Sequence, residues 1–473
     1  MRFILLFIFA PLFTPASFTT NMHSPQNIIL LVADSLRYDS VYANNNINLP
    51  YTLQNALQFT QARSSGCWTL PATASLFTGL MPHQHGATSQ TRYVSANVPT
   101  LAQKLKELGY ETYQVTANVA TTEIFGLHRG FDQVIKTWKI VPAKFNRLQQ
   151  FLVLIGKPRI RRMLFSKDML VSKMSEDIEA NKTWLQFTHE DTFNQARQII
   201  EQNEKLGKKS FIFVNLMESH FPYHVAPTFH MLSPGIINKF REIMGLFHAL
   251  NQTFLKTGKL NIKPDMLQTL RHRQRKSWEL IAPSVDAFIC EMHHERNTLL
   301  AFCADHGENF GDQGWLYHFS NVTEAGNRVP LFILPPYHHR SATTDIAINT
   351  KDLYHTFLHA AGANTNQPSL LLEPQASVPV MQSYWYNNHG KTLPQYKYNQ
   401  ICFINEENRY LFRAGKWYTA PVALHTEPEA LFTPLPGNTN PLYDCINNPT
   451  LRKNMLSILS DFLVFADKVG TGK

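Results

Sequence analysis

Apolar runs alternate with helical patterns along most of the chain, and this alternation predicts its architecture. Asn27–Ala33 is a continuous apolar run that ends at Asp34. Further strands are predicted at Glu111–Ala117, Ser210–Leu216, Thr298–Ala304 and Val329–Leu334. Continuous apolar strands are typical of a parallel sheet that is buried on both faces. Helices are predicted between them, at Val98–Leu108 and Asp352–Ala361 among others. We therefore predict an α/β fold with a doubly wound, mostly parallel sheet flanked by helices.

The pattern changes after about residue 375. Short strands separated by turns are predicted at Gln400–Asn405, Arg409–Arg413 and Lys416–Ala420, and a final helix at Leu451–Phe465. Short strands joined by short turns are typical of an antiparallel sheet. We predict a main domain at 27–375 and a C-terminal α+β subdomain at 376–473, built from a small antiparallel sheet and a helix.

Two long segments inside the main domain are predicted to be helical insertions, at 140–205 and 225–297. Both carry many Lys and Arg residues and no recognisable motif. Their basic faces are most simply solvated surface. The basic and apolar stretch Phe151–Phe165 could instead make a peripheral contact with a membrane.

The N-terminal residues 1–26 have two interpretations. Met1 and Arg2 precede the apolar run Phe3–Phe13, and cleavage after Ala16 would fit a signal peptide. The run is too short to span a bilayer. Alternatively, 1–26 is an N-terminal extension and synthesis begins at Met22. We favour export to the periplasm or the extracellular space over a cytoplasmic location.

Composition narrows the class of protein. Of the 473 residues, 44% are hydrophobic and 17% charged, which excludes a disordered chain. The net charge of +9 favours anionic partners. Zinc-finger spacings and a glycine-rich nucleotide loop are absent from the sequence, so nucleic acid is not expected as a partner. The five Cys residues form no close pairs, so we expect buried thiols and no disulfide framework.

The segment around Thr69 predicts a site for an anionic group. Pro71 suits the first position of a helix, and Gly79 ends the small apolar run that follows it. Thr69 would then lie just before a helix N-terminus, where free N–H groups and the helix dipole attract anions. The alternative is that Thr69 only caps the helix.

Acidic side chains follow two of the predicted strands. Asp34 ends the first strand, and Asp305 and His306 end the strand Thr298–Ala304. In open α/β sheets, ligands bind at the carboxyl ends of the strands. Two carboxylates and an imidazole beside the Thr69 hydroxyl would form a site for a divalent metal. The alternative is that each Asp serves only as a turn or cap residue.

These segments belong to a longer series of motifs. The chain resembles the sulfatase family of the alkaline phosphatase superfamily over roughly residues 27–465, and the motifs occur in the family's order. They are the strand and turn at 27–39, the nucleophile segment with its following turn at 68–86, and the later signatures at 125–132, 215–223, 305–314, 328–331 and 443–444.

The resemblance implies roles for named residues. Asp34, Asp305 and His306 would bind the metal, and Thr69 would be both a ligand and the nucleophile. His220 and His318 would contact the substrate or protonate the leaving oxygen. The alternative for each His is a structural hydrogen bond.

Departures from the family pattern point toward phosphate esters. Sulfatases carry Cys, or rarely Ser, matured to formylglycine, where this chain has Thr69, and they carry Arg where it has Thr73. A formylglycine hydrate expels sulfate by collapsing to an aldehyde. A threonine ester cannot do so, although a phosphothreonine can be displaced in line. Thr at this position is similar to the superfamily's phosphodiesterases and phosphoethanolamine or phosphoglycerol transferases. We expect a metal-dependent hydrolase that forms a covalent intermediate. The alternatives are such a transferase and a non-catalytic sulfatase-like binding protein.

The ligand set also predicts the metal. Three oxygens and one imidazole suit Mn²⁺ or Zn²⁺ better than Ca²⁺, which prefers six to eight oxygens. Many sulfatases also carry a second Asp where this chain has Ser35, so less negative charge would hold Ca²⁺ here. We expect one divalent ion, and a small, glycan-linked or lipid-linked anionic ester as the substrate. The sequence makes no prediction of oligomeric state.

Overall fold

The computed structural model describes most of the chain. The described residues are 24–42, 48–141, 187–221, 223, 262, 264–296, 298–318, 320–336, 341–364, 367–372, 378–384, 398–405, 407–422, 429–437 and 440–469. Every structural statement below concerns these residues.

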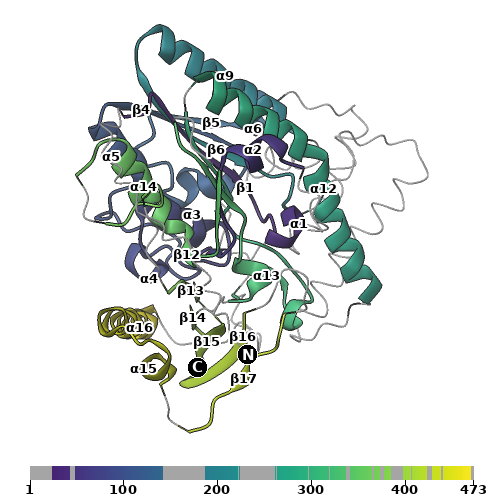
Figure 1. The fold of residues 1–473 in the computed structure, drawn as a ribbon, viewed down its shortest axis with the longest axis vertical. Coiled ribbons are helices and arrows are strands. Elements are labelled where there is room, and N and C mark those ends of the chain that lie inside the picture. Colours follow the sequence, from purple (N-terminus) through teal and green to yellow (C-terminus); the bar gives the residue numbers. More distant parts are fainter. Residues whose placement is uncertain are drawn as a thin grey trace, which may run out of the picture.

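A large sheet of eight strands organises the molecule (Figure 1). Its order is β11 (Ala342–Thr344), β2 (Leu57–Phe59), β10 (Leu331–Leu334), β7 (Leu299–Ala304), β1 (Asn27–Ala33), β6 (Lys209–Leu216), β4 (Tyr110–Thr116) and β5 (Gln133–Lys136). All neighbouring pairs are parallel except those that β10 makes with β7 and β2. The mostly parallel sheet predicted from the apolar runs is confirmed.

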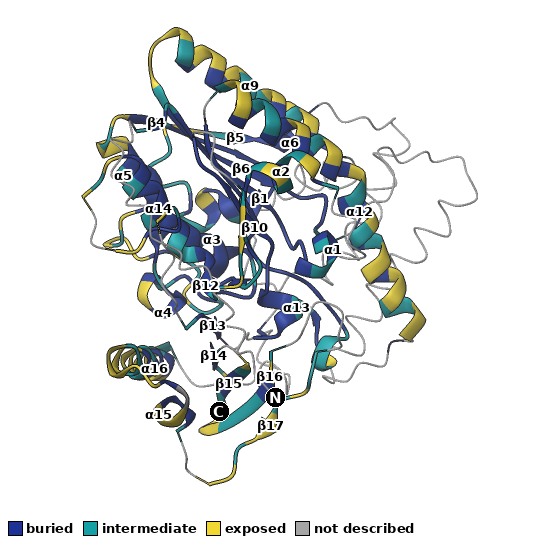
Figure 2. Cartoon of the chain, viewed as in Figure 1, coloured by how far each residue is buried: buried dark blue, intermediate teal, exposed yellow. Residues whose placement is uncertain are grey.

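Helices cover both faces of this sheet. On one face α3 (Thr69–Thr78), α5 (Leu101–Glu107) and α14 (Leu353–Ala360) pack together, and on the other lie α9 (His189–Lys205) and α12 (Pro264–Cys290) (Figure 1). The two layers leave the central strands without solvent contact: every residue of β1 is buried (Figure 2). This double burial explains why the strand reads as a continuous apolar run.

The C-terminal part forms a second sheet, as predicted. Its antiparallel strands are β13 (Val380–Ser383), β14 (Gln400–Ile404), β15 (Asn408–Arg413), β16 (Lys416–Pro421) and β17 (Thr433–Pro434). Helices α15 (Pro441–Cys445) and α16 (Pro449–Val469) complete this part. Met455, Leu459 and Phe462 of α16 form a common apolar cluster with Ile401 and Phe403 of β14, which attaches the helix to the sheet.

Short elements connect the larger ones. The remaining helices and strands are α1 (Tyr38–Tyr42), α2 (Pro50–Asn55), β3 (Ala62–Arg63), α4 (Pro82–His85), α6 (Thr137–Ile140), β8 (Asn309–Phe310), β9 (Leu316–Tyr317), α13 (Glu324–Asn327) and β12 (Ile348–Asn349), with 3₁₀ turns at Val119–Thr121, Glu123–Phe125, Asp312–Gly314 and Thr350–Asp352 and a π-helical turn at Glu291–Glu295.

The predicted insertions are described only in part. Helix α9 closes the first, and α12 with its π-helical turn forms the end of the second. The possible membrane contact at Phe151–Phe165 and the possible signal peptide lie outside the described residues, so both stay predictions, as do export and the domain boundaries. Among the helices that the structure describes, none combines the length and apolar character needed to cross a bilayer.

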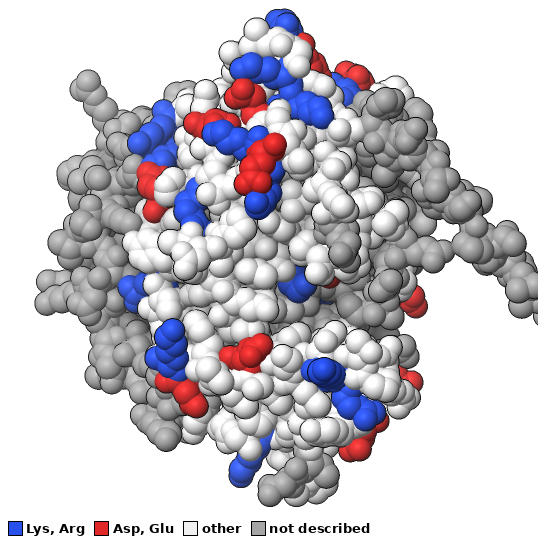
Figure 3. Space-filling view, turned by 90° about the vertical axis from the view of Figure 1, so that its left-hand side faces the viewer, with Lys and Arg blue, Asp and Glu red and all other residues white. Residues whose placement is uncertain are grey.

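Charged side chains of both signs share the surface, and the described thiols are free. On the face shown in Figure 3, Lys and Arg side chains lie among Asp and Glu side chains. Cys67, Cys303 and Cys402 are free and buried, and Cys290 is free and half-buried. The three buried thiols are packed as small apolar groups.

Candidate active site

Strand register brings Asp34 and Asp305 together. Strands β1 and β7 are adjacent and parallel, and Ala33 is paired with Ala304. The next residue on each strand is therefore an Asp at the same edge of the sheet. The Ser35 amide joins the two turns by donating a hydrogen bond of 3.1 Å to Asp305 Oδ1.

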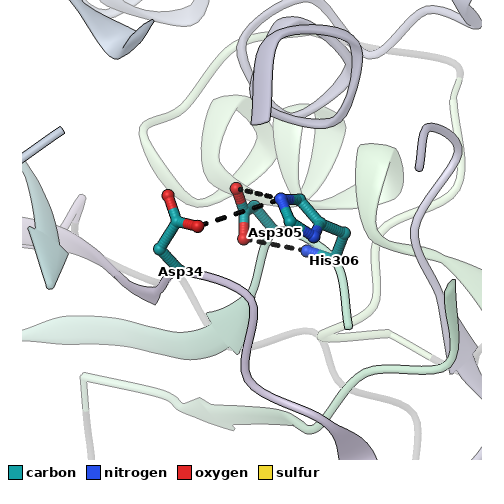
Figure 4. Close-up of side chains that lie close together, drawn as sticks. All are labelled: Asp34, Asp305 and His306. Atoms are coloured by element: carbon teal, nitrogen blue, oxygen red, sulfur yellow. Dashed lines mark hydrogen bonds and ion pairs between the residues drawn. The ribbon is translucent and has the colours of Figure 1, made fainter. Parts of the chain in front are cut away.

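Asp34, Asp305 and His306 form a buried cluster (Figure 4). One ligand atom from each residue lies within 4.8 Å of the others. His306 Nε2 is 3.8 Å from Asp34 Oδ1 and 3.4 Å from Asp305 Oδ2. His306 Nδ1 lies 2.8 Å from the Gly307 carbonyl oxygen, which can only accept a hydrogen bond, so this nitrogen carries a proton. In a neutral ring, the Nε2 lone pair then faces two carboxylates, as metal ligands do.

The carboxyl groups of Asp34 and Asp305 differ in their pKa shifts and in their hydrogen bonds. Burial and the neighbouring Asp34 charge raise the pKa of Asp305 well above its usual range. Burial also acts to raise the pKa of Asp34, but the imidazoles of His220 and His306 and a hydrogen bond from Asn118 outweigh it, and the pKa is lowered. Asp305 Oδ2 is buried without a hydrogen-bond partner. A bound cation would satisfy this oxygen, so the donor set fits a divalent metal.

Thr69 points its hydroxyl at this cluster. Its Oγ1 lies 3.5 Å from Asp34 Oδ2 and 3.4 Å from His306 Nε2, and the residue is 4% exposed. Helix α3 begins at Thr69, two residues before Pro71, so Thr69 is the first residue of the helix and does not precede it as predicted. The N-cap is Trp68, whose side chain makes no capping hydrogen bond. The hydroxyl thus lies at a helix N-terminus and contacts site residues.

Asn118 is a site residue that sequence analysis missed. It follows β4, at the same edge of the sheet as Asp34. Its Nδ2 donates hydrogen bonds to Asp34 Oδ2 at 2.6 Å and to Thr69 Oγ1 at 3.4 Å. The position just after a predicted strand was the available signal, but Asn is common in turns for local reasons.

His220 and His318 lie beside the cluster, as the family resemblance implied. The ring centres of His318 and His306 are 4.5 Å apart, and those of His318 and His220 are 5.3 Å apart. Burial lowers the pKa of His318 well below its usual value, and the other two imidazoles add to this effect. The fold therefore brings together every residue that the sequence nominated for the site.

Glu308 orients His318 and was not nominated. His318 Nδ1 lies 3.0 Å from Glu308 Oε1, and the Tyr223 hydroxyl donates to Glu308 Oε2 at 2.6 Å. Burial raises the pKa of Glu308 to about 7. The contact with Glu308 thus fixes the orientation of the His318 ring beside the cluster.

Solved structures share this fold. Phosphonate monoester hydrolase SpPMH from Silicibacter pomeroyi is 15% identical, with a TM-score of 0.55 over 94% of this chain and 96% of its own. BT4656, solved in complex with its substrate D-glucosamine-2-N,6-O-disulfate, is 12% identical, with a TM-score of 0.58 over 95% and 100%. Phosphonate monoester hydrolase of Agrobacterium radiobacter is 17% identical, with a TM-score of 0.56 over 93% and 96%. At these identities the likeness concerns the fold alone.

Sequence comparison adds the family. A search of curated proteins finds no match to this chain. The family model for Sulfatase matches residues 26–234 and 284–363, which is more than half of the chain. The matched segments contain Asp34, Thr69, Asp305 and His306. They also contain His220 and His318. The protein therefore belongs to the sulfatase family.

Proposed function

We propose that this protein hydrolyses phosphate or sulfate esters, with phosphate esters preferred, and that Thr69 is the nucleophile. The observation that carries this proposal is the Thr69 hydroxyl, buried at the N-terminus of α3 within 3.5 Å of both Asp34 and His306. Membership of the sulfatase family supports ester hydrolysis. A hydroxyl among free N–H groups and metal-ligand side chains fits an attack on an anionic tetrahedral group.

Asp34, Asp305, His306 and Thr69 would hold one divalent cation. Bound there, the ion would lower the pKa of the Thr69 hydroxyl and neutralise charge on the ester oxygens. Mixed carboxylate and imidazole ligands favour Mn²⁺ or Zn²⁺ over Ca²⁺. The unpartnered Asp305 Oδ2 supports an ion at this position.

The protein's own groups would divide the reaction into two steps. Thr69 Oγ1 forms a bond to phosphorus, the bond from phosphorus to the leaving oxygen breaks, and the Thr69 proton passes to a neighbouring base. His220 protonates the leaving oxygen as the alcohol departs, and His318, whose pKa is lowered, contacts the substrate as a neutral imidazole. Water then attacks the phosphothreonine, the bond from phosphorus to Oγ1 breaks, and phosphate leaves with the hydroxyl restored. Asn118 keeps Oγ1 oriented through both steps by donating from Nδ2.

Two residues support phosphate over sulfate. Thr69 has no route to the aldehyde through which formylglycine expels sulfate. Thr73, which stands where sulfatases carry Arg, is buried and its Oγ1 has no hydrogen-bond partner. A short neutral hydroxyl cannot replace a guanidinium in binding a sulfate group.

An anionic ester linked to a glycan is the substrate class that the comparisons support. BT4656 acts on a sulfated glucosamine, and the net charge of +9 favours anionic ligands in general. We extend this class to the present chain as part of the proposal.

The proposal is tested by an activity screen of the purified protein, loaded with Mn²⁺ or Zn²⁺, on aryl sulfate, phosphate monoester, phosphodiester and phosphonate substrates. The Thr69→Ala variant is screened in the same way. We expect release of the alcohol from the phosphate monoester, phosphodiester or phosphonate ester, and the loss of this release in the variant. Transfer of the phosphoryl group to an added alcohol in place of water would favour the transferase. Metal binding without turnover of any of these esters would favour the binding protein. Either result overturns the proposed hydrolysis.

A further inference from the structure

The one-turn helix α13 (Glu324–Asn327) holds the chain directly after His306. The Gly307 amide donates to the Gly326 carbonyl at 2.9 Å, and the Glu308 amide donates to the Ala325 carbonyl at 3.0 Å. A Cβ atom at Gly307 would collide with the Ala325 carbonyl oxygen, so the two backbones are in direct contact. Any displacement of α13 must therefore move the 305–308 loop, which carries Asp305 and His306.

The same helix also contacts the segment that leads to Thr69. The Ser64 amide donates to the Asn327 carbonyl at 2.8 Å. The Arg63 guanidinium, fully buried, donates to the Glu324 carboxylate from Nη2 at 2.8 Å and from Nε at 3.2 Å. Helix α13 therefore lies between the two chain segments that supply the metal ligands and the nucleophile.

The N-terminus of α13 is fixed from the C-terminal part of the chain. Glu429, which precedes β17, accepts hydrogen bonds from the Glu324 amide at 2.8 Å and the Ala325 amide at 3.3 Å. Arg409 of β15 pairs with the Glu429 carboxylate, and its Nη2 donates to the Ala430 carbonyl at 3.1 Å. Figure 1 shows α13 between the large sheet and the C-terminal strands.

Stability alone does not account well for this arrangement. The side chains of Arg409 and Glu429 are 0% and 5% exposed. Desolvation offsets much of the attraction in a buried ion pair, and apolar side chains often stabilise a core as well. A carboxylate differs from an apolar group because it accepts from two adjacent amides and so fixes a direction.

We propose that Glu429, held by Arg409, is a positioning residue for the active site. It fixes α13, and α13 fixes the 305–308 loop, so the C-terminal sheet sets the position of Asp305 and His306. This inference rests on the Glu429 and Arg409 side-chain contacts and on the backbone contacts of α13, and it does not require the chemistry proposed for Thr69.

Hydrogen exchange in the metal-free protein tests this link without substrate or turnover. In Glu429→Ala, peptides covering 305–310 should exchange on the order of tenfold faster, while peptides from β4 keep their rate. The affinity for Mn²⁺ or Zn²⁺ should fall roughly 10- to 100-fold, as for other groups that support metal ligands. Glu429→Gln keeps one acceptor oxygen, so we expect changes in exchange rate and metal affinity between those of the wild type and the alanine variant. The same variant replaces Glu429→Ala as the test if the alanine variant does not fold.

Glu291→Ala is the matched control. It removes the carboxylate that pairs with Arg197 at 2.8 Å. Glu291 precedes β7 whereas Asp305 follows it, so the two residues lie at opposite ends of that strand. We expect the 305–310 peptides and the metal affinity to be unchanged in this variant. The proposal is overturned if Glu429→Ala changes neither the exchange of the 305–310 peptides nor the metal affinity. It is also overturned if peptides from the whole variant exchange faster, which would indicate global destabilisation.

Discussion

Asn118 donates its Nδ2 to Asp34 Oδ2 over 2.6 Å, and the orientation of its amide is fixed by a second contact. Asn118 Oδ1 accepts a hydrogen bond of 2.7 Å from the Ala120 amide, so the NH₂ group must face the site. The same NH₂ group reaches Thr69 Oγ1 at 3.4 Å. One amide thus orients both the proposed metal ligand Asp34 and the proposed nucleophile Thr69.

Removing this amide should lower turnover more than stability. For Asn118→Ala we expect kcat to fall roughly 10- to 100-fold, with a smaller change in KM, because the orientation of Asp34 and Thr69 is lost. Steady-state kinetics and thermal unfolding measure both effects. Gln114→Ala is the control, since it removes a buried side chain that bonds to the Thr121 carbonyl and not to the site. Equal losses of kcat in the two variants would contradict a specific role.

The nucleophile can be tested by trapping. We expect Thr69→Ala to lose at least roughly 10⁴-fold in kcat, as other enzymes do on loss of a nucleophile. Rapid-quench mass spectrometry of the wild type should find a phosphorylated peptide containing Thr69. Thr78→Ala changes a threonine of the same helix whose hydroxyl donates to the Ala74 carbonyl and accepts from the Leu80 amide, and it should retain activity. An unmodified peptide with full activity in Thr69→Ala would exclude the mechanism.

Sulfate release should be the weaker activity. Because Thr69 stands where sulfatases mature Cys, mass spectrometry of the purified chain should find Thr69 and Cys67 unmodified and no formylglycine. We expect kcat/KM for an aryl sulfate to lie below that for the matching phosphodiester or phosphate monoester. Efficient sulfate release would show that Thr69 supports another route, and it would overturn the preference for phosphate.

Metal removal should abolish activity reversibly. Chelation leaves Asp34 and Asp305 as neighbouring buried carboxylates without a cation, and we expect Mn²⁺ or Zn²⁺ to restore turnover better than Ca²⁺. His306→Ala should weaken Mn²⁺ or Zn²⁺ binding, measured by titration of the metal-free protein, whereas His355→Ala on α14 should not. Elemental analysis that finds only calcium in the active protein would contradict the assignment of His306 as a ligand.

His189 should make stability depend on pH. Burial acts to lower the pKa of His189, but the Glu218 carboxylate, 3.4 Å from Nδ1, outweighs it and the pKa is raised. The pKa of Glu218 is lowered, because the interaction with His189 outweighs the effect of burial. A raised imidazole pKa stabilises the fold below the unfolded value of about 6.5, and this contribution is lost as the pH rises through the folded pKa.

His189→Gln should therefore be more harmful at pH 5.5 than at pH 8.5. We expect the variant to lose roughly 1 kcal/mol more unfolding free energy at the lower pH. Urea unfolding at the two pH values measures the difference. A loss of equal size at both would show that His189 acts through packing and not through its charge.

The central strands could be predicted because both of their faces are buried. β1, β6 and β7 appear in the sequence as apolar runs, and the structure places them within a residue of their expected bounds. The direction of β10 could not be predicted, since an apolar run of its length suits either orientation. The edge strand β11 and its neighbour β2 were missed because they are short and only partly buried.

The site could be predicted as far as its residues followed recognisable motifs. Asp34, Asp305 and His306 end predicted strands, and register alone brings them together. Glu308 lies inside the family signature at 305–314. Its contacts with His318 and Tyr223 could not be predicted, because they depend on how the loops fold. Glu429 reaches α13 across 105 residues of sequence, and neither its spacing nor its flanking residues indicate that contact.

The pairing of β1 with β6 and β7 also has a consequence for biosynthesis. Ser35 and Asp305, which join the two turns of the site, are 270 residues apart in the chain. Strand β1 waits with both edges unpaired until the ribosome has produced β6, and its edge toward β7 stays unpaired for longer still. An unpaired apolar edge is open to aggregation during this time, since long-range parallel pairing is slow. The cluster of Asp34, Asp305 and His306 can assemble only when β7 pairs with β1, so a metal could bind there only after most of the sheet has formed.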